Sequence, residues 1–242
     1  MQPKVSCYCS TFGRPHLLEE SIQSFLNQTY KNKELIIVND CKEQNLIFDH
    51  PEVKIINLKE RINPIGKKFN FSAFSCSGEI INPWDDDDIF MPWKIETGMK
   101  YLKNGAFHSG QGFLETQLGQ IKYFNSYFQC NLFLEKKIFK EINGYLEEDR
   151  RGLDVNLLER LHKKLGEIKI KIKKEEIFYL YRYNTVNCLH VSSLKDEKNL
   201  DKIYQEKIIN DPNFLKGDIV LKPHWKNDYI KLVKEYIDKN NF

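Results

Sequence analysis

The sequence has few of the features that mark a membrane protein, a nucleic-acid-binding protein or a disulfide-stabilised domain. It contains no stretch of 18 apolar residues, so no membrane-spanning helix is expected. The net charge is only +3, from 37 Lys and Arg against 34 Asp and Glu, and no nucleic-acid partner is expected. The six cysteines are scattered without C-x-x-C spacing, which argues against a zinc site or a disulfide framework and favours buried, reduced thiols.

The composition is that of a globular protein. With 242 residues, 41% hydrophobic and 29% charged, the chain is long enough to bury a substantial core. Its first residues lead directly into a strand-like segment, without a recognisable signal peptide, so we expect a cytoplasmic protein. Lysine alternates with isoleucine over 168–174 and is frequent after 193. Peripheral contact with an anionic membrane face is one interpretation of these lysines, and an ordinary edge strand is the alternative.

Four consecutive aspartates, at 85–88, are the most unusual feature of the chain. The apolar pair Ile80-Ile81 precedes them, and apolar residues resume at Ile89. Adjacent carboxylates repel one another, and placing them near a core is unfavourable unless a positive group compensates. A divalent cation bound by carboxylate oxygens at the end of a buried strand accounts for this pattern. An acidic surface loop is the alternative, but the apolar flanks favour the metal site.

The first ninety residues alternate strand-like and helix-like segments. The predicted strands are 5–9, 34–38, 53–58 and 79–84, and the predicted helices are 17–26 and 67–77. This order predicts a parallel sheet with right-handed crossovers, in which ligands bind beyond the carboxyl ends of the strands. Those ends carry 10–14, 39–40 and 85–88, so we expect polar side chains from three strands to converge on one crevice.

The second half has a different pattern. Alternating aromatic and polar residues with glycine breaks over 107–128 suggest hairpins, and 168–172 and 177–183 are strand-like. No internal repeat, low-complexity linker or clear domain boundary is evident. Helices are predicted at 93–103, 134–142 and 154–165, and then at 195–209 and 226–239 in the lysine-rich C-terminal part.

Six segments, in this order and spacing, resemble motifs of the family 2 glycosyltransferases, which are nucleotide-sugar enzymes of the GT-A fold. The similar segments are 10–14 (P-T-[YF]-N-R), 17–30 (L-x-E-S-I-x-S-[IL]-x-x-Q-[TD]-Y), 35–40 (I-I-V-D-D), 65–70 (G-x-[KA]-R-N), 78–88 (G-[ED]-[YI]-I-x-x-[WL]-D-x-D-D) and 144–154 (G-[FY]-D-E…G-E-D). The resemblance covers 5 to about 190. It implies an α/β GT-A domain over 1–192 with a single mixed central sheet.

That domain would consist of a nucleotide-sugar-binding half, 1–92, and an acceptor half, 93–192, followed by a C-terminal helical extension, 193–242. The residues implied to bind the nucleotide sugar are Ser10, Phe12, Arg14, Asp40, Lys67, Lys68, Asp85 and Asp86. Asp40 is expected to hydrogen-bond a pyrimidine base in a pocket lined by Ser10 and Phe12. Asp85 and Asp86 are expected to face the ribose and the metal, and Lys67 or Lys68 to approach the diphosphate.

The same resemblance implies the metal ligands and the general base. Asp87, the second aspartate of the D-x-D motif, is expected to bind Mg²⁺ or Mn²⁺. His190 is a second candidate ligand, with a structural or surface histidine as the alternative. Because Mg²⁺ combines one or two protein carboxylates with phosphate oxygens, not all four aspartates are expected to be ligands. Asp154 is expected to be the general base, with the carboxylates at 147–149 as rivals.

These roles imply an inverting glycosyltransferase that uses a nucleoside-diphosphate sugar, with UDP favoured, and a glycan or lipid-linked acceptor in bacterial surface polysaccharide synthesis. A cation neutralises the departing diphosphate, and a base accepts the proton of the acceptor hydroxyl. In the first segment Ser10 stands for the proline and Gly13 for the asparagine of the motif. Asn39 also replaces an aspartate, Phe69 an arginine and Leu153 a glutamate.

Two other functions compete with this interpretation. A sugar nucleotidyltransferase has a similar α/β arrangement, but it requires a glycine-rich, basic phosphate loop after the first strand, which 10–15 lacks. A non-catalytic protein that binds a glycan or a nucleotide is favoured by the replacements at Asn39 and Leu153.

Overall fold

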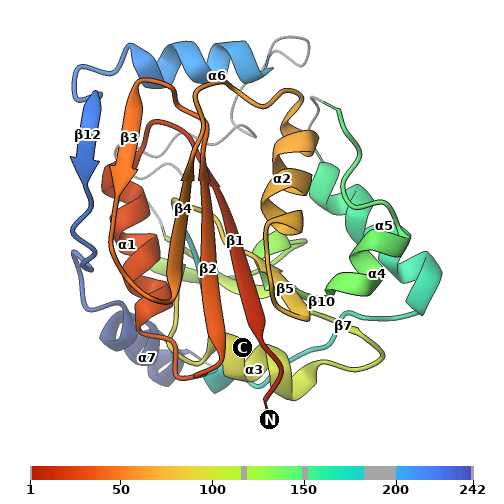
Figure 1. The fold of residues 1–242 in the computed structure, drawn as a ribbon. Helices are drawn as coiled ribbons and strands as arrows, with labels where there is room; N and C mark the ends of the chain where they lie inside the picture. Colours follow the sequence, from red (N-terminus) through yellow and green to blue (C-terminus); the bar gives the residue numbers. More distant parts are fainter. Residues whose placement is uncertain (1, 116–118, 149–151, 183–199, 241–242) are drawn as a thin grey trace.

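The computed structural model describes residues 2–115, 119–148, 152–182 and 200–240, and a mixed six-stranded sheet lies at its centre (Figure 1). The first four strands in the spatial order are parallel, whereas the fifth, β10, is antiparallel to both of its neighbours. This mixed sheet agrees with the expected α/β fold. The spatial order is β4 (Val53–Asn57), β2 (Lys33–Asn39), β1 (Val5–Thr11), β5 (Ile80–Pro83), β10 (Leu132–Glu135) and β7 (Ala106–His108).

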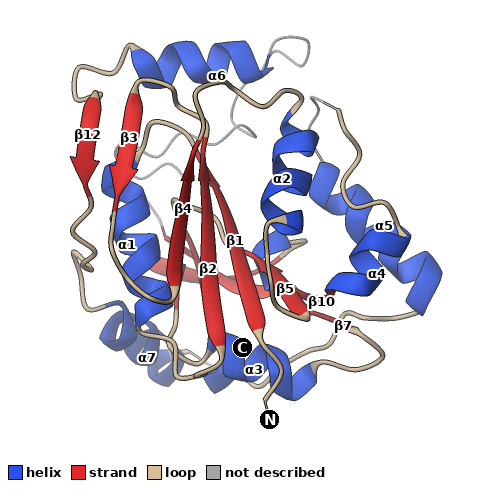
Figure 2. Cartoon of the chain, viewed as in Figure 1, coloured by secondary structure: helices blue, strands red, loops and turns tan. Residues whose placement is uncertain are grey.

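Helices cover both faces of the sheet, because alternate side chains of each strand point to opposite faces (Figure 2). Cys9 of β1 belongs to the same core cluster as Phe25 of α1. Its neighbour Tyr8 belongs to the second core cluster, with Phe139 of α4 and Leu158 of α5. The helices of this part of the chain are α1 (Pro15–Leu26), α2 (Ile65–Phe74), α3 (Lys94–Tyr101), α4 (Lys136–Glu141) and α5 (Leu153–Leu165).

Local sequence explains the first of these helices. Pro15 occupies the first turn, where its missing N–H costs no hydrogen bond. Leu18, Ile22 and Phe25 follow at spacings of three to four residues, and all three are fully buried. The helix therefore forms where the pattern predicted it.

A second, four-stranded sheet lies beside the acidic block, the name used below for residues 85–88. Its spatial order is β6 (Ile89–Phe90), β11 (Tyr179–Arg182), β8 (Gln111–Glu115) and β9 (Ile121–Asn125). β8 and β9 form the antiparallel pair expected from the hairpin pattern of 107–128. Short 3-10 turns, η1 (Gln129–Asn131) and η2 (Lys174–Glu176), connect these elements to the rest of the chain.

The C-terminal part folds back onto the first half. α6 (Leu200–Ile209) lies across the carboxyl ends of β1, β2 and β4, as Figure 1 shows. β12 (Gly217–Val220) pairs in parallel with β3 (Gln44–Ile47), and α7 (Tyr229–Lys239) buries Tyr229, Val233 and Ile237. The two predicted C-terminal helices are thus present, with a strand between them. The division into 1–192 and 193–242 remains a prediction.

Several predicted elements differ from the structure. Instead of one helix over 134–142, the chain forms β10 and then the short helix α4, because the apolar residues 132–134 are buried between β5 and β7. The Lys-Ile segment 168–172 forms one bridge, between His108 and Lys169, rather than a strand. β3 and β12 were not predicted, because each is short and depends on a partner distant in the sequence.

Two predictions from composition concern the described part of the chain. The five cysteines in this part, Cys7, Cys9, Cys41, Cys76 and Cys130, are buried and unpaired, as expected, whereas Cys188 lies outside it. None of its helices combines the length and apolar character that crossing a bilayer requires.

Candidate functional site

The side chains at the carboxyl ends of β1, β2 and β5 meet in one buried polar cluster, where the alternating pattern predicted a crevice. The name crevice is kept below for this cluster. Thr11, at the end of β1, donates from Oγ1 to Asp86 Oδ2 over 2.6 Å. Lys68 of α2 donates from Nζ to the carbonyl of Thr11 over 2.7 Å and to Asp40 Oδ1 over 2.6 Å. These contacts connect residues that follow three different strands, so the acidic block is linked to Asp40 through Thr11 and Lys68.

Arg14 compensates the middle of the acidic block. Its guanidinium donates from Nη2 to Asp86 Oδ1 over 2.5 Å and from Nη1 to Asp87 Oδ2 over 2.9 Å. All three side chains are almost completely buried. The positive charge that the sequence required near these carboxylates is therefore supplied, in this structure, by an arginine of the chain itself.

Asp88 is held on the other side of the block by the second sheet. Tyr179 donates its hydroxyl to Asp88 Oδ2 over 2.6 Å, and the backbone N–H of Arg182 donates to Oδ1 over 2.9 Å. The Arg182 side chain donates from Nε to the carbonyl of Asp87 over 2.5 Å and from Nη1 to Glu20 Oε1 over 2.6 Å. The sequence motifs gave no indication of Tyr179 or Arg182, because both lie about ninety residues from the block.

Asp85 has a different environment from its three neighbours. It is partly exposed and accepts a hydrogen bond from Gln129 Nε2 over 3.1 Å. In the described part of the chain no Lys or Arg nitrogen lies within ion-pair distance of it. Burial, and then the charge of Asp87, raise the pKa of Asp85 to about 6. Asp85 is thus the aspartate of the block with the most accessible carboxylate.

Asp85 opens into a small recess of about 10 Å³, roughly the room for one water molecule. The recess is lined by Tyr8, Ser10, Phe69, Pro83, Trp84, Asp85, Gln129 and Tyr145. Tyr8 and Tyr145 share a hydrogen bond of 2.9 Å between their hydroxyls. Burial raises the pKa of Tyr145, and the charges of Asp154 and Asp85 raise it further. Asp154 and Asp85 therefore both lie close enough to act on one tyrosine.

Asp154 lies in the first turn of α5, directly after Leu153 and Gly152. Gly152 adopts φ +75°, a conformation that suits glycine at this turn. Burial raises the pKa of Asp154, although backbone N–H groups at the helix N-terminus oppose this. Of its rivals, Glu147 and Glu148 are exposed, and 149 lies outside the described residues.

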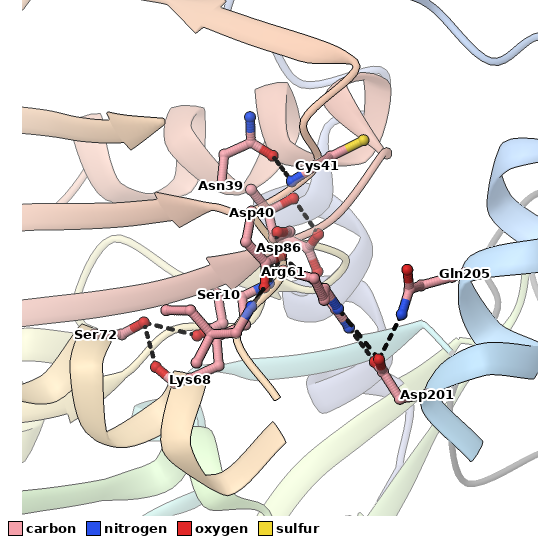
Figure 3. Close-up of polar contacts among 12 residues, drawn as sticks. Ser10, Asn39, Asp40, Cys41, Arg61, Lys68, Ser72, Asp86, Asp201 and Gln205 are labelled. Atoms are coloured by element: carbon pink, nitrogen blue, oxygen red, sulfur yellow. Dashed lines mark hydrogen bonds and ion pairs between the residues drawn. The ribbon is translucent and has the colours of Figure 1, made fainter. Parts of the chain in front are cut away.

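The other end of the crevice is built around Asp40, which is 1% exposed (Figure 3). Its Oδ1 accepts from Arg61 Nη1 and from Lys68 Nζ, each over 2.6 Å, and its Oδ2 accepts from the backbone N–H of Ile62 over 3.1 Å. Arg61 also lies over the ring of Phe12, 4.4 Å from its centroid. No motif pointed to Arg61, and its position between β4 and α2 gave no other signal.

The structure distinguishes between the two candidate lysines. Lys67 is exposed on α2, whereas Lys68 is buried in the crevice. Burial lowers the pKa of Lys68 to about 8, and the carboxylate of Asp40 opposes this shift. Ser10 lies at the edge of the crevice and shares a 2.8 Å hydrogen bond with Ser72. His190 lies outside the described residues.

Asn39 has a structural explanation. Its Nδ2 donates to the carbonyl of Gln44 and to Asn57 Oδ1, each over 2.9 Å, and its Oδ1 accepts from the N–H of Cys41 over 3.1 Å. A carboxylate could not donate the first two hydrogen bonds. The replacement of aspartate by asparagine therefore stabilises the turn after β2 and leaves Asp40 in the crevice.

Comparison with known proteins places this arrangement in a family. The sequence profile described as "Glycosyl transferase family 2" matches residues 6–160, well over half of the chain. The chain belongs to glycosyltransferase family 2. An uncharacterised glycosyltransferase of Methanocaldococcus jannaschii is 27% identical over 248 residues, covering 93% of this chain and 81% of the relative. Residues 6–160 contain every described candidate residue named above except Arg182 and Tyr179.

Two other relatives match a shorter part of the chain. A GalNAc(5)-diNAcBac-PP-undecaprenol beta-1,3-glucosyltransferase of Campylobacter jejuni is 33% identical over 114 residues, and an uncharacterised glycosyltransferase of Haemophilus influenzae is 33% identical over 118. These matches cover 44% and 46% of this chain, but only 37% and 36% of the two relatives. This family member thus shares with them about a third of their length.

Solved structures show the same fold. S. aureus TarS in complex with UDP-GlcNAc superposes with a TM-score of 0.61 at 15% identity, over 86% of this chain and 67% of that one. The mannosyltransferase PcManGT from Pyrobaculum calidifontis, in complex with GDP-Man and Mn²⁺, gives 0.55 at 14% identity, over 74% and 57%. At this level of identity the likeness establishes the GT-A fold of this family 2 member.

Proposed function

We propose that this family 2 member transfers a sugar from a nucleoside-diphosphate sugar to a hydroxyl group of a glycan or lipid-linked acceptor, with inversion and with a divalent cation. The observation that carries the proposal is the convergence of Asp40, Lys68, Arg14 and the acidic block on one crevice at the ends of three strands. The TarS complexes with UDP and UDP-GlcNAc support UDP as the nucleotide, and the undecaprenol-linked acceptor in the name of the Campylobacter relative supports a lipid-linked acceptor. A role in bacterial surface polysaccharide synthesis is part of the same proposal.

The two ends of the crevice suit two parts of such a donor. Phe12 and Asp40 lie at what we call the base end, the part of the crevice that Arg61 and α6 also line. Arg14 and Lys68 lie between that end and the acidic block, and their cationic groups suit the diphosphate. Asp85 and the recess come next, where the sugar and the acceptor would meet.

The described residues fit a divalent cation whose coordination shell is completed by the phosphate oxygens of the donor. In the described part of the chain no three His, Cys, Asp or Glu side chains gather into a cation site. Asp85 and Asp87, however, act on each other strongly enough to raise the pKa of Asp85, and Mg²⁺ needs only one or two carboxylates when phosphate oxygens complete its shell. Asp85 and Asp87 would hold Mn²⁺ or Mg²⁺ together with the donor diphosphate. When bound, the ion supplies neutralisation of the charge on the leaving diphosphate.

Asp154 is our candidate for the general base. Its partial burial and raised pKa suit a carboxylate that accepts a proton from an acceptor hydroxyl. As the hydroxyl oxygen forms its bond to the anomeric carbon, the bond to the diphosphate oxygen breaks, and the electron pair leaves with the nucleoside diphosphate. A single displacement of this kind inverts the anomeric carbon. Below the pKa of Asp154 the carboxyl is protonated, so the rate is expected to fall as pH falls through that value.

The test compares wild type with Asp154→Asn, using a panel of UDP- and GDP-sugars with Mn²⁺ and measuring release of the nucleoside diphosphate. Loss of the base should lower the rate by about 10²–10⁴-fold while UDP binding, measured by calorimetry, is unchanged. Glu148→Gln is the control, because Glu148 is an exposed rival carboxylate nearby, and its rate should equal that of wild type. Equal rates for wild type and Asp154→Asn would instead favour the non-catalytic binding protein.

Family membership and the fold give no support to the sugar nucleotidyltransferase. The cytoplasmic location, with or without peripheral membrane contact, remains a prediction. A thermal-shift panel of nucleoside diphosphates with and without Mn²⁺ would identify the base that the site prefers.

A further inference from the structure

Helix α6 covers the base end of the crevice. Tyr204 and Ile208 of α6 form a small hydrophobic cluster with Phe12 and Cys41, separate from the two large cores. The Tyr204 and Phe12 rings lie with centroids 6.2 Å apart, and Arg14 lies 5.6 Å from the centroid of Tyr204. Phe12, expected to line the base pocket, is in consequence only 4% exposed. A segment about two hundred residues away in the sequence therefore occupies the surroundings of the proposed base pocket.

The residue type at position 13 indicates that the sequence is adapted to the packing of α6 at this place. Family motifs carry asparagine at this position, whereas a Cβ on Gly13 would meet Ile208 Cγ2 at 2.4 Å and Phe214 at 3.1 Å. Asparagine tolerates the positive φ of +71° found here, so the backbone conformation alone does not require glycine. Glycine is required instead because Ile208 of α6 and Phe214, in the segment after it, approach Gly13 closely. The motif departure at Gly13 is thus matched to the position of α6.

Arg61 connects α6 to the crevice through its guanidinium (Figure 3). Nη1 donates to Asp40, while Nε and Nη2 both donate to the carboxylate of Asp201 on α6. Gln205, one turn further along α6, donates to Asp201 Oδ2 over 2.5 Å and fixes that carboxylate. One edge of the guanidinium thus faces the core of the crevice, and the other is occupied by α6.

We propose that Arg61 is a donor-binding residue for the nucleoside base, and that Asp201 of α6 occupies its guanidinium edge until a donor binds. The inference rests on the proposed function. A stacked guanidinium offers paired N–H donors, and a carboxylate and the carbonyl edge of a base are alternative acceptors for the same pair. The contact is assigned to the base rather than the diphosphate because Arg61 lies on Phe12 and Asp40, whereas Arg14 lies on the acidic block.

It follows that donor binding competes with the Arg61–Asp201 contact. A ligand that must displace an internal partner binds more weakly by the free energy of that partner's contact. Asp201→Asn keeps the size of the side chain but removes its charge. It should therefore raise the affinity for a nucleoside diphosphate by about tenfold, the equivalent of one charge-assisted hydrogen bond.

The experiment measures binding of UDP, GDP and inorganic diphosphate, each with Mn²⁺, to the full chain by calorimetry. The variants are Asp201→Asn, Arg61→Met and the control Glu206→Gln. Glu206 lies on the same helix, and its ion pair is with Lys202 at 3.9 Å, so this control loses the same charge without touching Arg61. Asp201→Asn should bind UDP or GDP about tenfold tighter than Glu206→Gln does, with equal affinity for diphosphate. Arg61→Met should bind the nucleotides more weakly and diphosphate as wild type does.

Hydrogen exchange of α6 gives a second readout that does not depend on Arg61→Met folding correctly. UDP with Mn²⁺ should speed exchange of the amides of 201–209 in wild type, and Asp201→Asn should speed it without ligand. Nucleotide affinity in Asp201→Asn that is equal to or below that of Glu206→Gln overturns the inference and leaves the proposed function standing. An equal gain for diphosphate overturns the assignment to the base. Failure of every variant to bind any of the three ligands overturns the proposed function and this inference with it.

Discussion

The negative charges of the acidic block are compensated differently on its two sides. On what we call the paired side, Asp86 and Asp87 meet Arg14, and Asp88 meets Tyr179 and the backbone of Arg182. On the recess side, Asp85 meets Gln129, and the nearby Asp154 is likewise without a Lys or Arg partner in the described part of the chain. The comparison suggests that the paired side maintains the structure of the block and the recess side is left reactive.

The pKa directions follow the same division. Burial alone raises the pKa of Glu20, but the Arg182 guanidinium and the Tyr229 hydroxyl outweigh it and hold the pKa below its ordinary value. Burial raises the pKa of Asp85 and of Asp154, and no neighbouring cation reverses the shift. Carboxyl groups with raised pKa values are suited to gaining a cation or a proton, so the recess side has the properties expected of a reaction site.

The largest effect is expected from breaking the paired side at Arg182. Arg182→Met leaves Glu20 buried without its guanidinium partner, and the ion pair is 5% and 1% exposed at its two side chains. The free energy of unfolding should fall by about 3–5 kcal/mol, as for other buried ion pairs that lose one partner. Urea unfolding followed by circular dichroism measures the change.

The double variant Glu20→Met with Arg182→Met is the control for this prediction. Because the double variant removes both charges, its loss of stability should be clearly smaller than the sum of the losses measured for the two single variants, Arg182→Met and Glu20→Met. Additive losses would show that the two residues act independently and would contradict the paired side as described.

A smaller effect is expected when a cation binds to its two proposed ligands, Asp85 of the recess side and Asp87 of the paired side. UDP with Mn²⁺ at about 100 times its dissociation constant should stabilise wild type by about 2.7 kcal/mol. Asp87→Asn and Asp85→Asn should lose most of this gain, since each removes one of the two proposed ligands. Thermal unfolding with and without Mn²⁺ checks it. Equal stabilisation of wild type and both variants would place the cation elsewhere.

The smallest effect is a gain of stability from removing the charge of Asp85. Its pKa is raised to about 6 in the folded chain, from an ordinary value of 3.8, so the folded state favours the protonated carboxyl. The stabilisation from this proton is full below the unfolded pKa and is lost as pH rises through about 6. Asp85→Asn should therefore be more stable than wild type at pH 7.5, on the order of 1–2 kcal/mol allowing for partial exposure.

The same comparison at pH 4 provides the control, because there Asp85 is protonated in the folded chain and the two proteins should differ little. A variant that is less stable than wild type at pH 7.5 would mean that the Asp85 carboxylate is stabilised by the fold. In that event the recess side would be compensated like the paired side, and the division between them would fail.

Sequence periodicity was sufficient for the part of the fold that positions the crevice. Alternating strands and helices in the first ninety residues imply a parallel sheet, and parallel strands place their carboxyl ends at one edge. The convergence of Asp40 with the acidic block followed from this geometry, and the structure confirms it. The motifs also pointed to Lys68, although they could not separate it from Lys67, because burial depends on how α2 packs.

Only the tertiary structure decided which groups compensate the charges. Arg61 and Asp201 are 140 residues apart, and Arg182 lies more than ninety residues from the aspartates it supports. β3 and β12 pair across a similar separation, and the apolar residues of β10 became a strand because two neighbouring strands were available. Local patterns fix periodicity and turns. Contacts between distant segments depend on packing that no single stretch of sequence encodes.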